Sequence, residues 1–436
     1  MNANMKHLFS NRGLYLAVLA CLALSVSLFG QQEGGGRAGR APLTPEQQAA
    51  RKAAADKYAA LHPTLATGSS APDFSVVDEQ GKKHTLSEYN KSPILAIIFQ
   101  CTHCPYAQMY EDRIQKLYED YTPKGVAIIA VNPNAALAAS PGELAYTDVD
   151  DSYENMAIRQ KLRQLTYPYF YDGYTQVMSQ AYGPKATPHV FIFDKDRKLQ
   201  YDGRLDDSQV EARVTTHDAR AALDEMLAGQ PVAVPHTPAF GCATKWADQI
   251  EAKQKAVKDW QALPVTIEPA TADTLKELRA NTTGKVLLLT FYSTKCARCV
   301  AEFPDLITSY LWYKVRPFNM VTISTDGPSA QADVQKLLDD QHSAGRNLQF
   351  ASADTAALQK AFDGKTWNTH EPYTVVIAPN GDVVYEGNNK AGDDVLHVRR
   401  VILANLPDTS NYAGFASHWA NNLRLEALEE KLVAKR

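Results

Sequence analysis

The sequence predicts an α/β protein with two tandem domains of the same plan, each a central mixed β-sheet flanked by helices. Two observations support this prediction. An apolar run of strand length, a Cys-x-x-Cys pair and a helical apolar stripe follow one another twice, over residues 94–121 and 286–311. An Xaa-Pro step before a β-hairpin also occurs twice, over residues 187–201 and 371–385. The length of 436 residues is sufficient for two or three domains, each with its own core.

The first repeat begins with residues 94–99, a continuous apolar run typical of a strand buried on both faces of a sheet. It leads directly into Cys101-Thr102-His103-Cys104-Pro105. Apolar and aromatic residues then recur at helical spacing up to residue 121, and residues 126–131 supply the next strand. This order predicts a right-handed βαβ unit with a dithiol between strand and helix.

The second repeat follows the same order. Residues 286–291 form the apolar run, Cys296-Ala297-Arg298-Cys299 the dithiol, residues 300–311 the helical stripe and residues 320–323 the next strand. A second βαβ unit is therefore predicted.

Both halves also end with the same pattern, an Xaa-Pro step followed by a predicted β-hairpin. Thr187-Pro188 precedes predicted strands at 189–193 and 199–201, and Glu371-Pro372 precedes predicted strands at 373–377 and 383–385. A proline at the first residue of a strand, followed by a hairpin, is compatible with sheet hydrogen bonding.

The first thirty residues are built like a secretory signal. Lys6 and Arg12 precede an uncharged apolar run at 14–28, and small residues close it. Retention as a membrane anchor through residues 14–30 is the alternative, because a spanning helix needs about 17 residues. We therefore expect an exported protein, periplasmic or otherwise extracytoplasmic, in an oxidising compartment.

The expected organisation is a signal peptide or anchor (1–30), a flexible leader and helix (31–67), domain 1 with the CTHC dithiol (68–229), a Pro-rich linker with Cys242 and a helix (230–264), domain 2 with the CARC dithiol (265–406) and a helical tail (407–436).

Charge and motif content exclude several classes. Lys and Arg number 45 against 49 Asp and Glu, so nothing indicates nucleic-acid binding. No flavin- or nicotinamide-binding glycine fingerprint follows either lead strand, so we expect no cofactor besides the redox-active cysteines. Pro105 and Val300 stand where a c-type haem motif requires histidine. Reducing equivalents must then come from a membrane or periplasmic dithiol donor or from a small thiol.

A strand, a Cys-x-x-Cys pair, a helix and a later Xaa-Pro before a hairpin resemble the thioredoxin fold, in which this proline is cis and lies against the dithiol. Domain 1 is similar to the peroxiredoxin-like, AhpC/TSA-type redoxins through motifs that span about residues 68–246. These include Ala71-Pro72-Asp73-Phe74, the sequence around the CTHC dithiol, residues 203–207 and residues 240–246. Domain 2 resembles the TlpA-like thiol-disulfide oxidoreductases, although Lys295 and Glu371 depart from the pattern of that family.

Thiol-disulfide exchange needs an exposed thiolate and a second thiol that resolves the mixed disulfide. The first cysteine of each pair should lie at the positive end of a helix, which lowers its pKa. We therefore predict Cys101 and Cys296 as attacking thiols, and Cys104 and Cys299 as resolving thiols.

Residues beside the dithiols should tune and shape each site. His103 and Arg298 can place positive charge beside a thiolate, which favours the reduced form and a couple more oxidising than that of thioredoxin. The resemblance implies that Pro188 and Pro372 shape a substrate groove. It also implies that the backbone groups of the residues before them, Thr187 and Glu371, are free to pair with substrate.

The leading interpretation is an exported thiol-disulfide oxidoreductase acting on protein or small-molecule thiols, with its two dithiols working in series or independently. A peroxiredoxin-like, antioxidant thiol peroxidase is an alternative. However, Ile98 stands three residues before Cys101, where peroxidases usually have Thr or Ser. A third interpretation is copper or zinc binding through the CTHC thiols with His103 or His189. Cys242 is expected to be either inert or a transient partner of Cys101.

Overall fold

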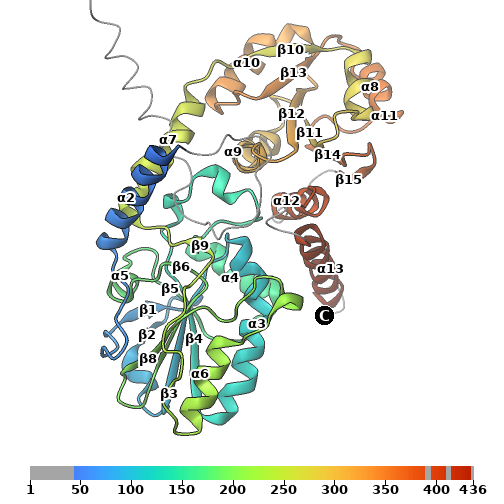
Figure 1. The fold of residues 1–436 in the computed structure, drawn as a ribbon. Helices are drawn as coiled ribbons and strands as arrows, with labels where there is room; N and C mark the ends of the chain where they lie inside the picture. Colours follow the sequence, from blue (N-terminus) through green and yellow to red (C-terminus); the bar gives the residue numbers. More distant parts are fainter. Residues whose placement is uncertain (1–43, 388–393, 409–413, 434–436) are drawn as a thin grey trace, which may run out of the picture. The chain divides into compact units, whose positions relative to one another are not determined.

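The computed structural model describes residues 44–387, 394–408 and 414–433 (Figure 1). The predicted signal segment, 1–30, and most of the leader lie outside the described residues. Two mixed sheets flanked by helices confirm the predicted tandem α/β architecture, and we call the two halves module 1 and module 2. No helix within the described ranges combines the length and the apolar character needed to cross a bilayer.

The helix predicted after Thr44 is present as α2 (Pro45–Leu61). Its first residue is Pro45, as expected from the fixed φ of proline and its missing N–H.

The strands of module 1 are β1 (Ser75–Val77), β2 (Lys83–Thr85), β3 (Ile94–Phe99), β4 (Val126–Asn132), β5 (Tyr169–Tyr171), β6 (Ala186–Thr187), β7 (His189–Phe193), β8 (Leu199–Gly203) and β9 (Cys242–Ala243). Its helices are α3 (Pro105–Tyr121), α4 (Tyr153–Arg163), α5 (Val177–Tyr182) and α6 (Asp218–Leu227). The main sheet has the order β2-β1-β5-β4-β3-β7-β8, and β6 and β9 form a separate two-stranded sheet.

Strand β3 lies in the middle of the module 1 sheet, and all six of its residues are buried. It pairs parallel with β4 and antiparallel with β7, with Ile97 opposite Ile129 on one side and Phe191 on the other. Residues of α3, α4 and α6 cover one face of this sheet, and residues of α5 pack on the other. The uninterrupted apolar run is explained by this burial on both faces.

Module 2 contains the strands β10 (Ile267–Ala270), β11 (Val286–Tyr292), β12 (Phe318–Ser324), β13 (Arg346–Phe350), β14 (Tyr373–Ile377) and β15 (Val383–Gly387). Its helices are α8 (Ala272–Ala280), α9 (Ala297–Tyr313), α10 (Gln331–Asp340), α11 (Thr355–Asp363) and α12 (Asp394–Asn405), followed by α13 (Phe415–Val433). The sheet order is β10-β13-β12-β11-β14-β15, with β11 central and buried throughout.

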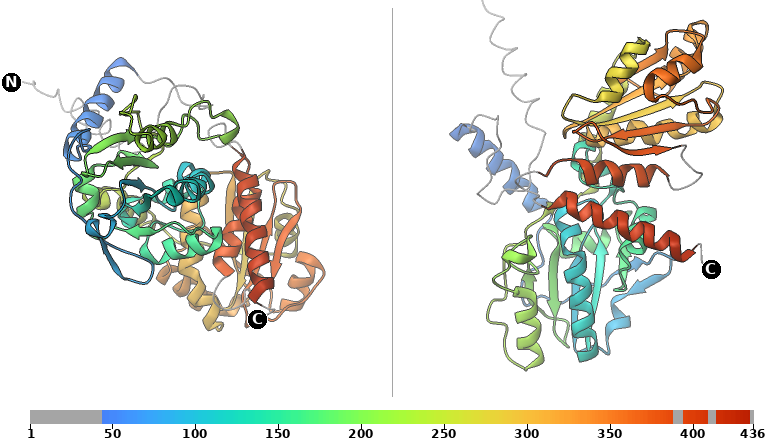
Figure 2. Two further views of the ribbon diagram at one scale, coloured as in Figure 1. Left: turned by 90° about the horizontal axis from the view of Figure 1, so that it is seen from below. Right: turned by 90° about the vertical axis from the view of Figure 1, so that its right-hand side faces the viewer.

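The two faces of the module 2 sheet are covered by different helices. Residues of α8 and α11 pack on one face, and residues of α9, α12 and α13 on the other. Helices α12 and α13 lie side by side (Figure 2), joined by hydrogen bonds from His397 and Arg400 to Glu426. The predicted terminal helix is therefore part of the module 2 core.

The segment expected to be a linker, 230–264, differs from the prediction. Its first part packs on module 1: the Thr237 N–H donates to the Asp202 carbonyl at 3.1 Å, and β9 pairs with β6. Only α7 (Ile250–Gln261) and its flanks remain as the connection. Backbone pairing and the Thr237 hydroxyl, which accepts a hydrogen bond from the Arg204 N–H, hold the first part in place.

A buried acidic residue joins the two modules. Asp148, in the loop before α4, accepts hydrogen bonds from Arg159 of module 1 at 2.6 Å and from Arg400 of module 2 at 2.7 Å. Burial raises the pKa of Asp148, but the two guanidinium charges outweigh burial and lower it overall. The Tyr313 hydroxyl donates to the Thr147 carbonyl beside it. The two modules therefore share a fully buried ionic contact.

Candidate active site

Helix α3 begins at the residue directly after the CTHC dithiol, so the second cysteine of the pair is the N-cap residue of the helix. Cys104 is the N-cap residue of α3, and Pro105 is the first helical residue. Cys101 lies upstream, in the turn after β3. The prediction that Cys101 occupies the helix end is wrong, because Pro105 starts the helix immediately after Cys104. In module 2 the prediction is correct, since Cys296 is the N-cap of α9.

Three thiols meet at the module 1 site. Cys101 and Cys104 are unpaired thiols with 1% and 0% of their surfaces exposed, whereas Cys242 is partly exposed. The Cys242 N–H donates to the Cys104 sulfur at 3.3 Å. The Thr187 hydroxyl lies 3.0 Å from the Cys101 sulfur. Cys242 thus adjoins Cys104 and lies in the same cluster as Cys101, its predicted transient partner.

The electrostatics of the site favour a thiolate on Cys104. Burial raises its pKa, but this effect is outweighed by hydrogen bonds from the Cys101 and Cys242 thiols, by the charge of His103 and by the backbone N–H of Ala107. The pKa of Cys104 is therefore well below its usual value. Burial, the hydrogen bond with Cys104 and the charge of Asp151 raise the pKa of Cys101. The reduced site therefore favours the ionised form of Cys104 and the protonated form of Cys101.

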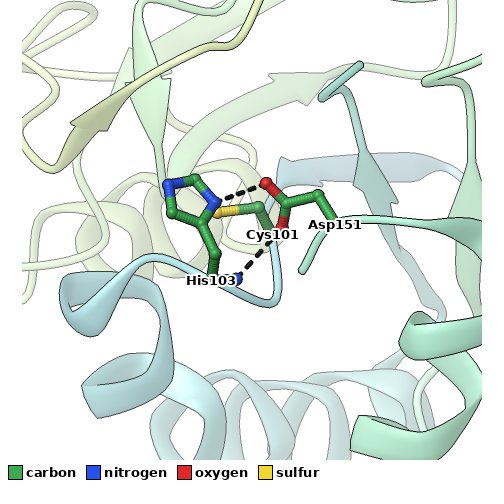
Figure 3. A group of neighbouring side chains, drawn as sticks. All are labelled: Cys101, His103 and Asp151. Carbon is green, nitrogen blue, oxygen red and sulfur yellow. Dashed lines mark hydrogen bonds and ion pairs between the residues drawn. The ribbon is translucent and has the colours of Figure 1, made fainter. Parts of the chain in front are cut away.

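A buried carboxylate holds the turn between the cysteines (Figure 3). Asp151 accepts hydrogen bonds from the backbone N–H groups of Thr102 and His103, at 2.9 and 3.0 Å, and a short one from the His103 ring. Asn134 donates to the same carboxylate at 2.8 Å. Burial lowers the pKa of His103, but the Asp151 charge outweighs this and raises it overall. The imidazolium predicted beside the thiolate is thus supported by a buried counter-charge.

A second positive charge lies near the thiols. Lys245 is buried, and its ammonium group donates to Glu143 at 2.6 Å. Burial lowers the pKa of Lys245, but the charges of Glu143, Cys242 and Cys104 raise it overall. Lys245 therefore stays charged close to Cys104 and Cys242.

The prolines expected to shape the substrate grooves differ between the modules. Thr187-Pro188 is a cis peptide, as the resemblance implies. Thr187, however, is not free for substrate, because it is paired with Cys242 in the β6–β9 sheet. Glu371-Pro372 is trans, which corrects the expectation for module 2. The Glu371 N–H donates to the Asn368 carbonyl in a turn that delivers the chain directly into β14.

The module 2 site holds a disulfide between Cys296 and Cys299, both almost fully buried. Tyr292, Phe303 and two residues of α10, Val334 and Leu338, pack around it. Arg298, predicted to sit beside a thiolate, pairs with Glu302 one turn further along α9, at 2.9 Å. The Arg298 charge is therefore balanced by Glu302 on the same helix.

Both modules match one known protein family. The model of the AhpC/TSA family matches residues 67–202 and 254–386, one match in each module. The chain belongs to the AhpC/TSA family. The predicted resemblance of module 1 is thereby confirmed, and the family model covers module 2 as well.

Similar proteins of known name include the thiol-disulfide oxidoreductases ResA of Geobacillus kaustophilus, 32% identical, and of Geobacillus thermodenitrificans, 29% identical. Each match covers 31% of this AhpC/TSA chain and 68% of the relative. Among solved structures, a hypothetical protein from Sinorhizobium meliloti is 32% identical, with a TM-score of 0.38, and covers 42% of this chain and 96% of its own. An uncharacterised protein from Geobacillus kaustophilus is 34% identical, also with a TM-score of 0.38, and covers 42% and 94%.

Cys101, His103 and Asp151 of this AhpC/TSA protein also offer ligand atoms within 4.8 Å of one another, as a metal site would require. However, the Asp151 oxygens already accept hydrogen bonds from Thr102, His103 and Asn134. A metal ion would have to compete with the bonds that hold the turn. The arrangement therefore fits a hydrogen-bonded turn better than a metal site. His189, the other proposed ligand, accepts a hydrogen bond from the Lys185 N–H.

Sequence reasoning missed Asp151, Asn134 and Lys245. Asp151 lies 48 residues from His103 along the chain and belongs to no motif that marks it. Lys245 lies three residues after Cys242, within residues 240–246, so its closeness to that thiol was a usable signal.

Proposed function

We propose that this AhpC/TSA protein is an exported thiol-disulfide oxidoreductase that exchanges disulfides with protein or small-molecule thiols through two dithiols. The observation that supports it most directly is the place of Cys104, which is buried at the N-cap of α3 and adjoined by Cys242, with a pKa well below its usual value. The relatives named thiol-disulfide oxidoreductase point to the same chemistry.

In the reducing direction, a protein thiolate attacks one sulfur of a substrate disulfide and forms a mixed disulfide, while one substrate thiolate leaves. The second cysteine of the pair then attacks the protein sulfur of the mixed disulfide. This closes the Cys-x-x-Cys disulfide and releases the second substrate thiolate. Two electrons pass to the substrate, and the reverse sequence oxidises a dithiol.

The Cys101–Cys104 couple should be more oxidising than thioredoxin. Stabilising the Cys104 thiolate stabilises the reduced form, and His103 and Lys245 both place positive charge near it. We therefore expect a reduction potential above the roughly −270 mV of thioredoxin.

Export is proposed from the charge and apolar pattern of residues 1–30. In an oxidising compartment the dithiols need a membrane or periplasmic dithiol donor, or a small thiol, to be reduced again. N-terminal sequencing of the protein recovered from its native compartment distinguishes a cleaved signal from a retained anchor.

The decisive experiment titrates the full chain in glutathione redox buffers, alkylates the free thiols and maps each cysteine by mass spectrometry. We expect reversible two-electron titration of Cys101–Cys104 and of Cys296–Cys299. If neither pair forms a reversible disulfide, the proposed function is wrong. Turnover of hydrogen peroxide that is fast and lost in Cys101→Ser would instead favour the peroxidase alternative.

A further inference from the structure

A segment of the chain itself lies over the module 1 dithiol. Residues 237–246, which we call the strap, are fixed at both ends. Near the start, the Thr237 N–H donates to the Asp202 carbonyl at 3.1 Å. Near the end, the Lys245 N–H donates to the Asn134 side chain at 2.8 Å, and the Thr244 hydroxyl donates to the Pro184 carbonyl at 2.7 Å. Cys242 lies between these anchors.

Gly241 allows the strap to approach Thr187 closely. Its φ is +150°, and a Cβ atom there would lie 2.1 Å from the Thr187 carbonyl oxygen. No residue with a side chain fits this position without displacing the strap. The next residue, Cys242, is consequently paired with Thr187 and held against Cys104.

The strap leaves the three thiols unequally accessible. Cys101 and Cys104 are buried beneath it with Ala107, while Cys242 and Tyr106 are partly buried at the edge of the same cluster. A substrate strand cannot pair with Thr187, since the strap already does. Of the three cysteines at this site, Cys242 is the one that is partly exposed, so it is the first that an external thiol would meet.

We propose that Cys242 is a third redox thiol, which exchanges disulfides with external thiols at the surface and transfers them to and from the buried pair through a Cys104–Cys242 disulfide. This inference rests on the thiol-disulfide exchange proposed above and specifies its route in module 1.

Starting from the Cys101–Cys104 disulfide, the Cys242 thiolate attacks the Cys104 sulfur. The Cys101–Cys104 bond breaks, Cys101 leaves as a thiolate and takes a proton, and Cys104–Cys242 forms; no net electrons move in this step. An external thiolate then attacks the Cys242 sulfur, and Cys104 leaves as a thiolate.

A second external thiol attacks the external sulfur of the mixed disulfide. Cys242 is released as a thiolate, and the external disulfide departs. In sum, two external thiols lose two electrons and two protons. The buried pair gains both electrons and one proton, on Cys101, and the second proton goes to solvent because Cys104 is left as a thiolate.

The surroundings of Cys104 suit it to be the sulfur shared by both disulfides. It is the N-cap residue of α3, accepts the Cys242 N–H and adjoins His103, so it leaves readily as a thiolate when the external thiolate attacks Cys242. A thiol of low pKa is the better leaving group in thiol-disulfide exchange. In the reduced site, the hydrogen bond to Cys104 and burial raise the pKa of Cys242, and the Lys245 charge opposes them. Once Cys104 is bound in the disulfide, it no longer carries the charge that raises this pKa, and Lys245 then favours the attacking Cys242 thiolate.

Disulfide mapping tests the pairing directly. The full-length Cys101→Ser variant is oxidised with glutathione disulfide, digested without reduction and analysed by mass spectrometry. We expect a peptide linked through Cys104 and Cys242. In the matched Cys104→Ser variant we expect little linkage between Cys101 and Cys242. Equal linkage in both variants, or none in Cys101→Ser, overturns the proposal.

Kinetics test the route. The oxidised full chain is mixed with glutathione, and reduction of Cys101–Cys104 is followed by quenched alkylation. We expect Cys242→Ser to slow this reduction by about tenfold or more, because access limits attack on buried sulfur. Ala243→Ser, the neighbouring strap residue, should leave the rate unchanged. An unchanged rate in Cys242→Ser, or equal slowing in both variants, refutes the inference. Failure of the wild-type pair to form any reversible disulfide would instead refute the proposed function.

Discussion

Asp151 is predicted to control both the stability of the dithiol turn and the ionisation of Cys104, and Asp151→Asn isolates its charge. The amide oxygen can still accept from the backbone N–H groups of Thr102 and His103. The amide nitrogen, however, replaces the oxygen that faces the His103 ring and Asn134. Two charge-assisted hydrogen bonds are lost, each worth about 1.5–3 kcal/mol, and a neutral imidazole recovers part of one. We expect the free energy of unfolding to fall by about 2–4 kcal/mol.

The pH dependence follows from the two pKa shifts. The lowered pKa of Asp151 gives stability that is full above the unfolded value of about 3.9 and is lost as the pH falls through the folded value. The raised pKa of His103 gives stability that is full below about 6.5 and is lost as the pH rises through the folded value. The difference between wild type and variant should therefore be largest between about pH 4 and 6.5.

Two measurements check this prediction, denaturant unfolding across pH and titration of the Cys104 thiolate by its ultraviolet absorbance. The variant should titrate at higher pH than the wild type, because neutral His103 no longer favours the thiolate. Asp150→Asn removes the same charge one residue away, where the carboxylate binds Ser152 and Asn155, and should leave the titration unchanged. A flat stability difference across pH, or identical thiolate titrations, would refute the reasoning.

Three further predictions concern packing and coupling. Asp148→Asn removes the charge between two buried guanidinium groups and should lower the free energy of unfolding by about 3–5 kcal/mol, measured by denaturant unfolding. Gly241→Ala should lower the free energy of unfolding by about 1–3 kcal/mol and speed alkylation of the buried thiols. Gly229 has open space around it, so Gly229→Ala should not speed alkylation. The Cys296→Ser/Cys299→Ser double variant should leave the redox midpoint of the module 1 dithiol unchanged, because each pair lies in the core of its own module. Glutathione titration measures this midpoint, and a shift would show that the two sites are coupled.

The elements could be predicted where burial alone determines them. Strands β3 and β11 are apolar throughout because both faces of each sheet are covered, so their limits were found within a residue. The two dithiols followed from their place between strand and helix. The cap on α3 was within reach as well, since Pro105 marks the first residue of a helix.

The rest of the site is brought together by irregular segments of the chain, whose course leaves no periodic pattern in the sequence. Asp151 reaches His103 only through the course of the irregular chain between β4 and α4. Cys242 was assigned to a linker because prolines surround it. The pairing of β9 with β6 depends instead on Gly241, whose role is visible only against Thr187.

The Asp148 contact has a practical consequence for dissecting the protein. A cut between the modules would leave Asp148 without Arg400 and would remove Asn422 from Arg163. It would also uncover Trp419, which is fully buried and lies near the Arg159 guanidinium. Each isolated half would then present charges and apolar surface that the intact chain keeps from water. Reduction potentials measured on such halves would describe altered molecules. The potential of each dithiol should therefore be measured in the undivided chain.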